Sequence, residues 1–191
     1  MINLIIFDLD GTLVKTHTPS LLPGVLDFFH QVLQHNEAAG SPPHLAIATN
    51  QGGVGFRYWI ERDHFGIPLL YPTQESVEKR LQTVVSALGG NEITLPVYVC
   101  YAYVNRQGEW SPTPPGKETD PRWQPGWRKP RPGMLIQAMQ DRGVSAAETL
   151  YVGDRDEDKG AARAAGCQFS DARDFFNRDW NAPEAFTSAK G

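Results

Sequence analysis

Four short polar motifs carry the side chains that could do chemistry, and the first directly follows an apolar run. This motif is Asp8-Leu9-Asp10-Gly11-Thr12, after the apolar residues 3–7. Two carboxylates one residue apart lie on the same side of an extended backbone, and a hard cation such as Mg²⁺ lets both stay ionised. Gly11 allows a sharp turn. The pattern therefore favours a catalytic carboxylate pair over an aspartate that only caps a turn.

The second and third motifs supply groups that suit a phosphate. Residues 49–53 (TNQGG) follow the apolar run 44–48 and offer hydroxyl, amide and glycine backbone groups. Arg128-Lys129-Pro130 precedes a helical stretch, where a fixed ammonium can neutralise charge on a transferring phosphoryl group. An ordinary polar turn and a solvated basic turn are the alternative interpretations. We expect Lys129 to act in catalysis, and we expect four residues to bind substrate: Thr49, Asn50, Gln51 and Arg128.

The fourth motif is an acidic cluster, residues 153–158 (GDRDED), at the end of another apolar run. Such a density of acids repels without a cation, although acids are also favourable at a helix N-terminus. The helix explanation accounts for Asp156 and Glu157 but not for a cluster that begins where a buried strand ends. We therefore expect Asp154 to bind the metal, with Asp158 one turn later as a supporting acid.

The elements around these motifs alternate between apolar runs and amphipathic stretches, as in an α/β fold with a parallel sheet. The runs predict strands over 3–7, 44–48, 95–100, 149–152 and about 167–169. The amphipathic stretches predict helices over 23–33, 75–88, 133–142 and through 161–165. The apolar face of the first helix is expected to hold Leu26, Phe29, Val32 and Leu33, and that of the third Met134, Leu135, Ala138 and Met139. Polar groups that follow parallel strands meet at one edge of the sheet, where ligands bind.

Two segments break this alternation. Residues 53–73 have no clear period, and residues 103–132 hold seven of the fifteen prolines and three of the five tryptophans. Tryptophan is rare in linkers, so the second segment is expected to be an ordered loop near the sheet edge, over the site. We expect a single domain over 1–180 and a flexible tail over 181–191.

The composition of the chain argues against several classes of protein. The net charge of −4 leaves no overall basic footprint for nucleic acid. No apolar run is long enough for a signal peptide or a membrane span, so we expect a cytoplasmic protein without membrane contact. Two cysteines, Cys100 and Cys167, support neither a disulfide framework nor a complete zinc site.

The order and spacing of DLDGT, TN, KP and GDxxxD resemble the four motifs of the haloacid dehalogenase (HAD) superfamily over about residues 3–172. The resemblance implies a Rossmann-like three-layer sandwich with a mostly parallel five-stranded sheet and, here, no large cap. It implies that Asp8 forms an aspartyl phosphate and that Asp10 is the acid and base. It also implies that Thr49-Asn50 binds the phosphoryl group and that Lys129 stabilises charge. Mg²⁺ would lie between Asp8, the backbone carbonyl of Asp10, and Asp154.

Within the superfamily, ATNQGGV and RKPRPGML are most similar to the histidinol-phosphate and heptose bisphosphate phosphatases, and polynucleotide 3′-phosphatases are related. The histidinol-phosphate and heptose bisphosphate phosphatases commonly carry a zinc-binding loop of cysteines and a histidine. Here only Cys100 matches, with Ala102, Tyr103, Pro125 and Trp127 near the other ligand positions, so we expect no structural zinc.

The resulting hypothesis is a Mg²⁺-dependent phosphatase acting on a sugar phosphate, a sugar bisphosphate or a similar small metabolite. A nucleic-acid 3′-end phosphatase and a non-catalytic binding protein on the same fold are the alternatives. A phosphotransferase is a minor one, since these usually have larger caps. Substrate identity, oligomeric state and the role of residues 103–132 are left open.

Overall fold

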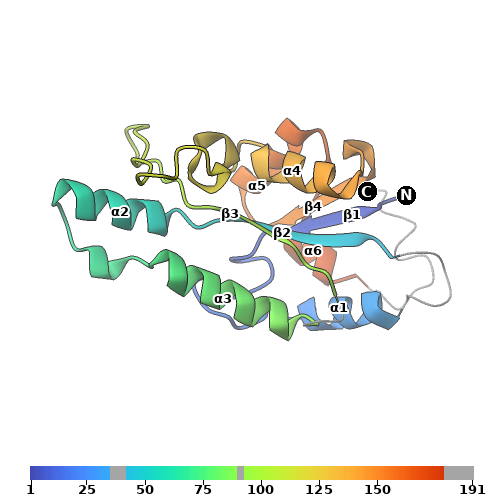
Figure 1. The fold of residues 1–191 in the computed structure, drawn as a ribbon. Coiled ribbons are helices and arrows are strands. Elements are labelled where there is room, and N and C mark those ends of the chain that lie inside the picture. Colours follow the sequence, from blue (N-terminus) through green and yellow to red (C-terminus); the bar gives the residue numbers. More distant parts are fainter. Residues whose placement is uncertain (35–41, 90–92, 179–191) are drawn as a thin grey trace.

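Five short strands pair in one sheet with the order β3-β2-β1-β4-β5, and every pairing is parallel (Figure 1). The structure is a computed structural model that describes residues 1–34, 42–89 and 93–178. The tail predicted over 181–191 lies outside these residues. The α/β fold class and the five-stranded sheet are confirmed, and the sheet is entirely parallel. The strands are β1 (Leu4–Phe7), β2 (His44–Asn50), β3 (Val97–Cys100), β4 (Thr149–Gly153) and β5 (Gln168–Asp171).

The register aligns the ends of the central strands. Leu4 of β1 pairs with His44 of β2 on one side and with Thr149 of β4 on the other. Strand β2 continues through Asn50, so the TNQ motif starts within the strand and not after it. The DLDGT, TNQ and GDxxxD motifs therefore meet at the same edge of the sheet, as expected for parallel strands.

Successive side chains of a strand point to opposite faces of the sheet, and in these strands both sets are mostly apolar. Helices therefore cover both faces of the sheet. Helices α4 and α5 pack on one face, and α1, α3 and α6 on the other (Figure 1). None of the helices in the described ranges is both long and apolar enough to cross a membrane. The helices are α1 (Val25–Gln34), α2 (Gly53–Asp63), α3 (Gln74–Ala87), α4 (Gly133–Arg142), α5 (Asp156–Ala165) and α6 (Ala172–Phe176), and the 3₁₀ turns are η2 (Pro68–Leu70), η3 (Pro121–Trp123), η4 (Pro125–Trp127) and η5 (Ala146–Glu148).

The apolar face predicted for the first helix is rotated in the structure. Leu26 is 39% exposed and Leu33 is half-buried. The inward face begins at Val25, because Phe28 packs edge-on against Phe7 at 5.6 Å and Phe175 at 5.0 Å between ring centroids. The face of α4 is as predicted and holds Met134, Leu135, Ala138 and Met139.

The segment without a clear period contains α2 and η2, neither of which the sequence predicted. Helix α2 buries only three of its residues, so its sequence has no continuous apolar stripe. Arg57 joins this helix to the connection that follows by donating from Nη1 to the carbonyls of Pro68 and Tyr71, at 3.2 and 2.9 Å. Figure 1 shows α2 and the start of α3 projecting beyond the ends of the strands.

Residues 103–132 pack against the edge strand β3 and the residues that follow it. The amide of Tyr101 donates to the carbonyl of Arg122 at 2.6 Å, and the ring of Trp123 lies 5.5 Å from that of Tyr101. The ring of Trp127 lies 6.3 Å from that of Tyr98. Aromatic packing thus orders this proline-rich loop in place of regular secondary structure.

Candidate active site

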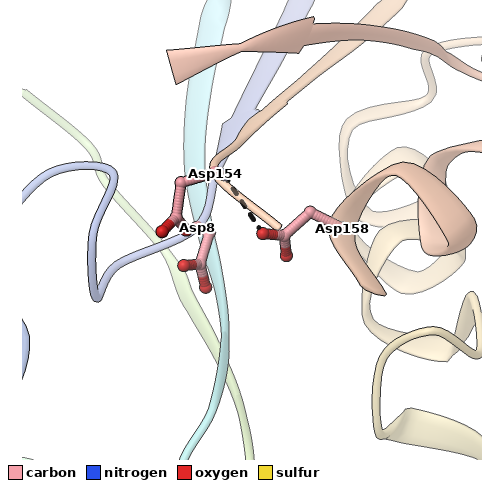
Figure 2. A group of neighbouring side chains, drawn as sticks. All are labelled: Asp8, Asp154 and Asp158. Atoms are coloured by element: carbon pink, nitrogen blue, oxygen red, sulfur yellow. Dashed lines mark hydrogen bonds between the residues drawn. The ribbon is translucent and has the colours of Figure 1, made fainter. Parts of the chain in front are cut away.

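Three carboxylates meet at the carboxyl edge of the sheet. Asp8 follows β1, Asp154 follows β4, and Asp158 lies in the first turn of α5 (Figure 2). One oxygen from each lies within 4.8 Å of the others. Asp8 and Asp158 are buried, whereas Asp154 is exposed. Among the described residues this set of oxygen donors suits a hard cation such as Mg²⁺.

Both carboxylate oxygens of Asp158 accept hydrogen bonds from protein groups. Its Oδ1 accepts from the ammonium of Lys129 at 2.6 Å and from the hydroxyl of Tyr151 at 2.9 Å. Its Oδ2 accepts from the backbone amides of Asp154 at 3.3 Å, drawn in Figure 2, and Arg155 at 3.1 Å. These bonds hold the turn that carries Asp154, and they suit the supporting role predicted for Asp158 better than direct metal ligation.

Lys129 reaches the same centre from the loop before α4. Its Nζ donates to Asp8 Oδ1 at 2.5 Å and to Asp158, and it also lies 2.7 Å from the Tyr151 hydroxyl and 3.1 Å from the carbonyl of Ala48. An ammonium has three protons, so these four acceptors share them. Tyr151 was not predicted, because a tyrosine inside an apolar strand gives no local signal of a role.

Burial and charge shift the titration of this buried centre. Burial raises the pKa of Asp8 to about 6, with the Lys129 ammonium opposing the rise and Asp158 adding to it. For Lys129, burial alone would lower the pKa, but the carboxylates of Asp8 and Asp158 raise it. The ammonium therefore stays charged beside the carboxylate that it contacts.

Gly11 is required by the turn that follows Asp10. Its φ of +92° lies in a region that other residues rarely adopt, and a Cβ atom there would overlap the carboxylate of Asp154. The absence of a side chain lets the first and fourth motifs approach each other.

The predicted substrate-binding residues divide into two groups. Thr49 is buried, and its Oγ1 accepts from Gln51 Nε2 at 2.9 Å. The Asn50 amide instead holds the Lys129 backbone, donating to its carbonyl and accepting from its amide, both at 3.1 Å. Arg128 donates from Nη1 to the carbonyl of Ala102 at 3.1 Å. Thr49 and Gln51 thus bond to each other, whereas Asn50 and Arg128 bind protein backbone.

Asp10 is not part of the three-carboxylate group and forms an ion pair with Arg80 of α3. Arg80 Nη1 and Nη2 donate to Oδ1 and Oδ2 at 2.7 and 2.9 Å. The amide of His17 and the side chain of Gln51 also donate to this carboxylate, both at 2.8 Å. Burial would raise the pKa of Asp10, but the hydrogen bonds from Arg80, His17 and Gln51 lower it to about 2. The sequence predicts the helix that contains Arg80 but gives no sign that Arg80 contacts Asp10.

A pocket of about 650 Å³ opens beside Asp10. Its walls come from the loop after β1, the end of β2 and the residues that follow it, the segment before α3, α3 itself and Arg155. Residues 103–132 contribute no side chain to this lining. The lining residues are Asp10, Thr16, His17, Asn50, Gln51, Gly52, Gly53, Leu70, Tyr71, Pro72, Ser76, Val77, Arg80 and Arg155.

Known proteins resemble this chain in both sequence and fold. A family profile described as HAD-hydrolase-like matches residues 126–170. The D-glycero-beta-D-manno-heptose-1,7-bisphosphate 7-phosphatase of Pseudomonas aeruginosa is 33% identical over 124 residues, which are 65% of this chain and 53% of the relative. A D-glycero-D-manno-heptose-1,7-bisphosphate 7-phosphatase of Thermosynechococcus vestitus is 29% identical over 157 residues, which are 82% of this chain and 68% of the relative. The chain therefore resembles HAD-like hydrolases, through the family profile over residues 126–170 and through these two relatives over most of its length.

A solved structure supports the fold. The D,D-heptose 1.7-bisphosphate phosphatase from B. bronchiseptica, complexed with magnesium and phosphate, aligns with a TM-score of 0.57 and 23% identity. The alignment covers 88% of this chain and 79% of that one. The chain spans about half the length of the Pseudomonas relative and about two thirds of the Thermosynechococcus one.

Cys100, the residue that matches the zinc loop of related enzymes, is buried on β3 among apolar side chains. Burial raises the pKa of its thiol to about 11, which disfavours the thiolate that a metal requires. It belongs to no metal-binding group among the described residues. The prediction that the protein lacks structural zinc is still to be tested by metal analysis.

Proposed function

We propose that the protein is a Mg²⁺-dependent phosphatase that hydrolyses a small sugar bisphosphate through a phosphorylated Asp8. The observation that carries the proposal is the buried Asp8 carboxylate, which lies against Lys129 and beside Asp154. The two heptose bisphosphate phosphatases that the chain resembles support a sugar bisphosphate as the substrate class.

The first step uses Asp8 and Asp10. An oxygen of Asp8 attacks phosphorus while the bond from phosphorus to the leaving oxygen breaks, and a proton on Asp10 passes to that oxygen. The products are an aspartyl phosphate and the free alcohol. Asp10 is ionised when paired with Arg80, so it must take up a proton, which the negative charge of a bound substrate favours.

The second step reverses the role of Asp10. Its carboxylate takes a proton from water as the water oxygen attacks phosphorus, and the bond from phosphorus to the Asp8 oxygen breaks. Inorganic phosphate leaves and Asp8 is restored. The hydrogen bonds from Arg80, His17 and Gln51 lower the pKa of Asp10 and favour its ionised form, which suits this base role.

The remaining groups position the phosphoryl group and neutralise its charge. Lys129 stabilises charge on the phosphoryl oxygens, and Thr49 with Gln51 lies where those oxygens can be hydrogen-bonded. Asp8, Asp154 and the backbone carbonyl of Asp10 would hold Mg²⁺, which supplies positive charge that offsets the negative charge of the phosphoryl group. Asn50 acts on Lys129 by holding its backbone in place.

The test is phosphate release from a panel of phosphomonoesters with and without Mg²⁺. The panel includes sugar bisphosphates, nucleotides and a 3′-phosphorylated oligonucleotide. We expect turnover of a sugar bisphosphate that requires Mg²⁺ and is lost in Asp8→Asn. The matched control is Asp171→Asn, at the carboxyl end of β5 and outside the site. Mg²⁺-dependent activity retained by Asp8→Asn would reject the mechanism, and preference for the oligonucleotide would reject the substrate class.

A further inference from the structure

Arg80 of α3 lies next to Asp10 and is one of two arginines that line the pocket, the other being Arg155. The Arg80 side chain is 14% exposed and lines the pocket together with Ser76 and Val77 of the same helix. Its guanidinium holds both oxygens of Asp10 and also donates from Nη2 to Gln51 Oε1 at 2.9 Å. Arg80 is thus joined to the acid–base group and to the phosphate-binding turn at once.

The position of Arg80 relative to the substrate follows from the position of Asp10. In the proposed reaction, Asp10 contacts the oxygen that leaves with the alcohol. A group that hydrogen-bonds to Asp10 therefore lies against the first atoms beyond that oxygen, which are the ester carbon and the substituents of its neighbour. Arg80 occupies this place on the pocket wall.

The Arg80 guanidinium has more N–H donors than its contacts with Asp10 and Gln51 use. A guanidinium carries five N–H groups, and the contacts with Asp10 and Gln51 use three of them. Helix α3 is already anchored by the buried side chains of Val77, Leu81 and Val84, so the ion pair is not needed to place the helix. A guanidinium presents donors in a fixed plane that suits oxygen acceptors.

We propose that Arg80 determines substrate specificity by hydrogen-bonding to an oxygen on the carbon next to the ester carbon of the leaving group. The substrates selected are phosphomonoesters that carry a hydroxyl, carbonyl or carboxylate oxygen there, over plain alkyl phosphates. This inference rests on the proposed function, because it places the leaving group beside Asp10.

The test compares two substrates that differ only at this oxygen, glycerol 3-phosphate and 3-hydroxypropyl phosphate. For the wild type we expect kcat/KM to favour glycerol 3-phosphate by about tenfold or more, the effect of one hydrogen bond to a charged group. Arg80→Met should abolish the preference, and Arg80→Lys should keep part of it. Lys79→Met, an exposed neighbour on α3, is the control for loss of charge and should keep the preference. An equal fall on both substrates in Arg80→Met would overturn the proposal and leave Arg80 as a residue that only positions Asp10.

A binding measurement separates this inference from the proposed reaction. Calorimetry on Asp8→Asn with Mg²⁺ compares the affinities for the two compounds without turnover, and thermal unfolding checks that each variant is folded. We expect tighter binding of glycerol 3-phosphate, lost when Arg80→Met is added. Such binding without any wild-type turnover would sustain the role of Arg80 and reject the phosphatase. Equal affinities for the two compounds would reject the role of Arg80 even if turnover is found.

Discussion

The inner and outer sides of the site both contain a cation paired with a carboxylate, but the two pairs differ in burial. On the inner side, the side chains of Lys129 and Asp8 are 2% and 8% exposed. On the outer side, those of Arg80 and Asp10 are each 14% exposed and line the pocket. The outer pair therefore faces a pocket with space for the part of a ligand that lies beyond Asp8.

This difference separates two tasks. The inner groups have little contact with water and satisfy one another, so their geometry is set before substrate arrives. The outer pair can exchange one partner for a substrate oxygen because solvent already reaches it. Changes on the inner side should lower both stability and rate, whereas changes on the outer side should lower rate with little effect on stability.

The largest effect is expected for Lys129→Met. Removal of the ammonium leaves the buried carboxylates of Asp8 and Asp158 unpaired, which should cost about 3–5 kcal/mol of unfolding free energy. The rate should fall by about 10³-fold, since one positioned charge is lost from the transition state. Urea unfolding and phosphate release measure the two effects. Lys159→Met, at an exposed position of α5, serves as the control. An unchanged stability would mean that the inner pair is less coupled than its contacts indicate.

Asp10→Asn tests the outer side. Loss of the acid–base group should lower kcat by about 10²–10⁴-fold. The melting temperature should change little, because asparagine can keep one hydrogen bond to Arg80 and the pair is partly exposed. A loss of stability as large as that of Lys129→Met would remove the distinction between the two sides.

The pH dependence of the rate should report the inner side. Burial raises the pKa of Asp8 to about 6, so its ionised, nucleophilic form is lost as the pH falls through that value. Below it, kcat/KM should fall about tenfold per pH unit. Mg²⁺ favours the ionised carboxylate, so a higher Mg²⁺ concentration should move this limb to lower pH. A profile whose acidic limb does not respond to Mg²⁺ would assign the limb to another group.

Tyr151→Phe should have the smallest effect of the four. It removes one acceptor of Lys129 and one donor to Asp158 while keeping the ring. We expect a loss of about 1 kcal/mol of stability and about tenfold in kcat with KM unchanged, because Lys129 is less well oriented. Tyr98→Phe, whose hydroxyl donates to Asp141 at 2.7 Å outside the site, should lower stability alone. Equal kcat values for these two variants would leave Tyr151 with a purely structural role.

Much of the architecture can be read from the sequence, because a buried parallel strand has a continuous apolar run that ends abruptly in polar residues. This local contrast predicts β1 to β4 and the edge where Asp8, Thr49 and Asp154 meet, whereas β5 (QFSD) has no continuous apolar run. Helix α2 could not be predicted in this way, since only Val54, Gly55 and Ile60 are buried and its aromatic residues follow no period. The inward face of α1 depended on aromatic packing with Phe7 and Phe175, which sequence spacing does not record.

The motif residues to which we assign the chemistry can be found from the sequence, because each stands at a strand end where a polar side chain has few structural reasons to be. The groups that surround them are known only from the fold. Arg80 lies 70 residues from Asp10, and Tyr151 lies 22 residues from Lys129. Each is an ordinary residue in its own element, an arginine on an amphipathic helix and a tyrosine in a strand. They acquire their proposed roles only because the fold brings Arg80 against the carboxylate of Asp10 and the Tyr151 hydroxyl against the ammonium of Lys129.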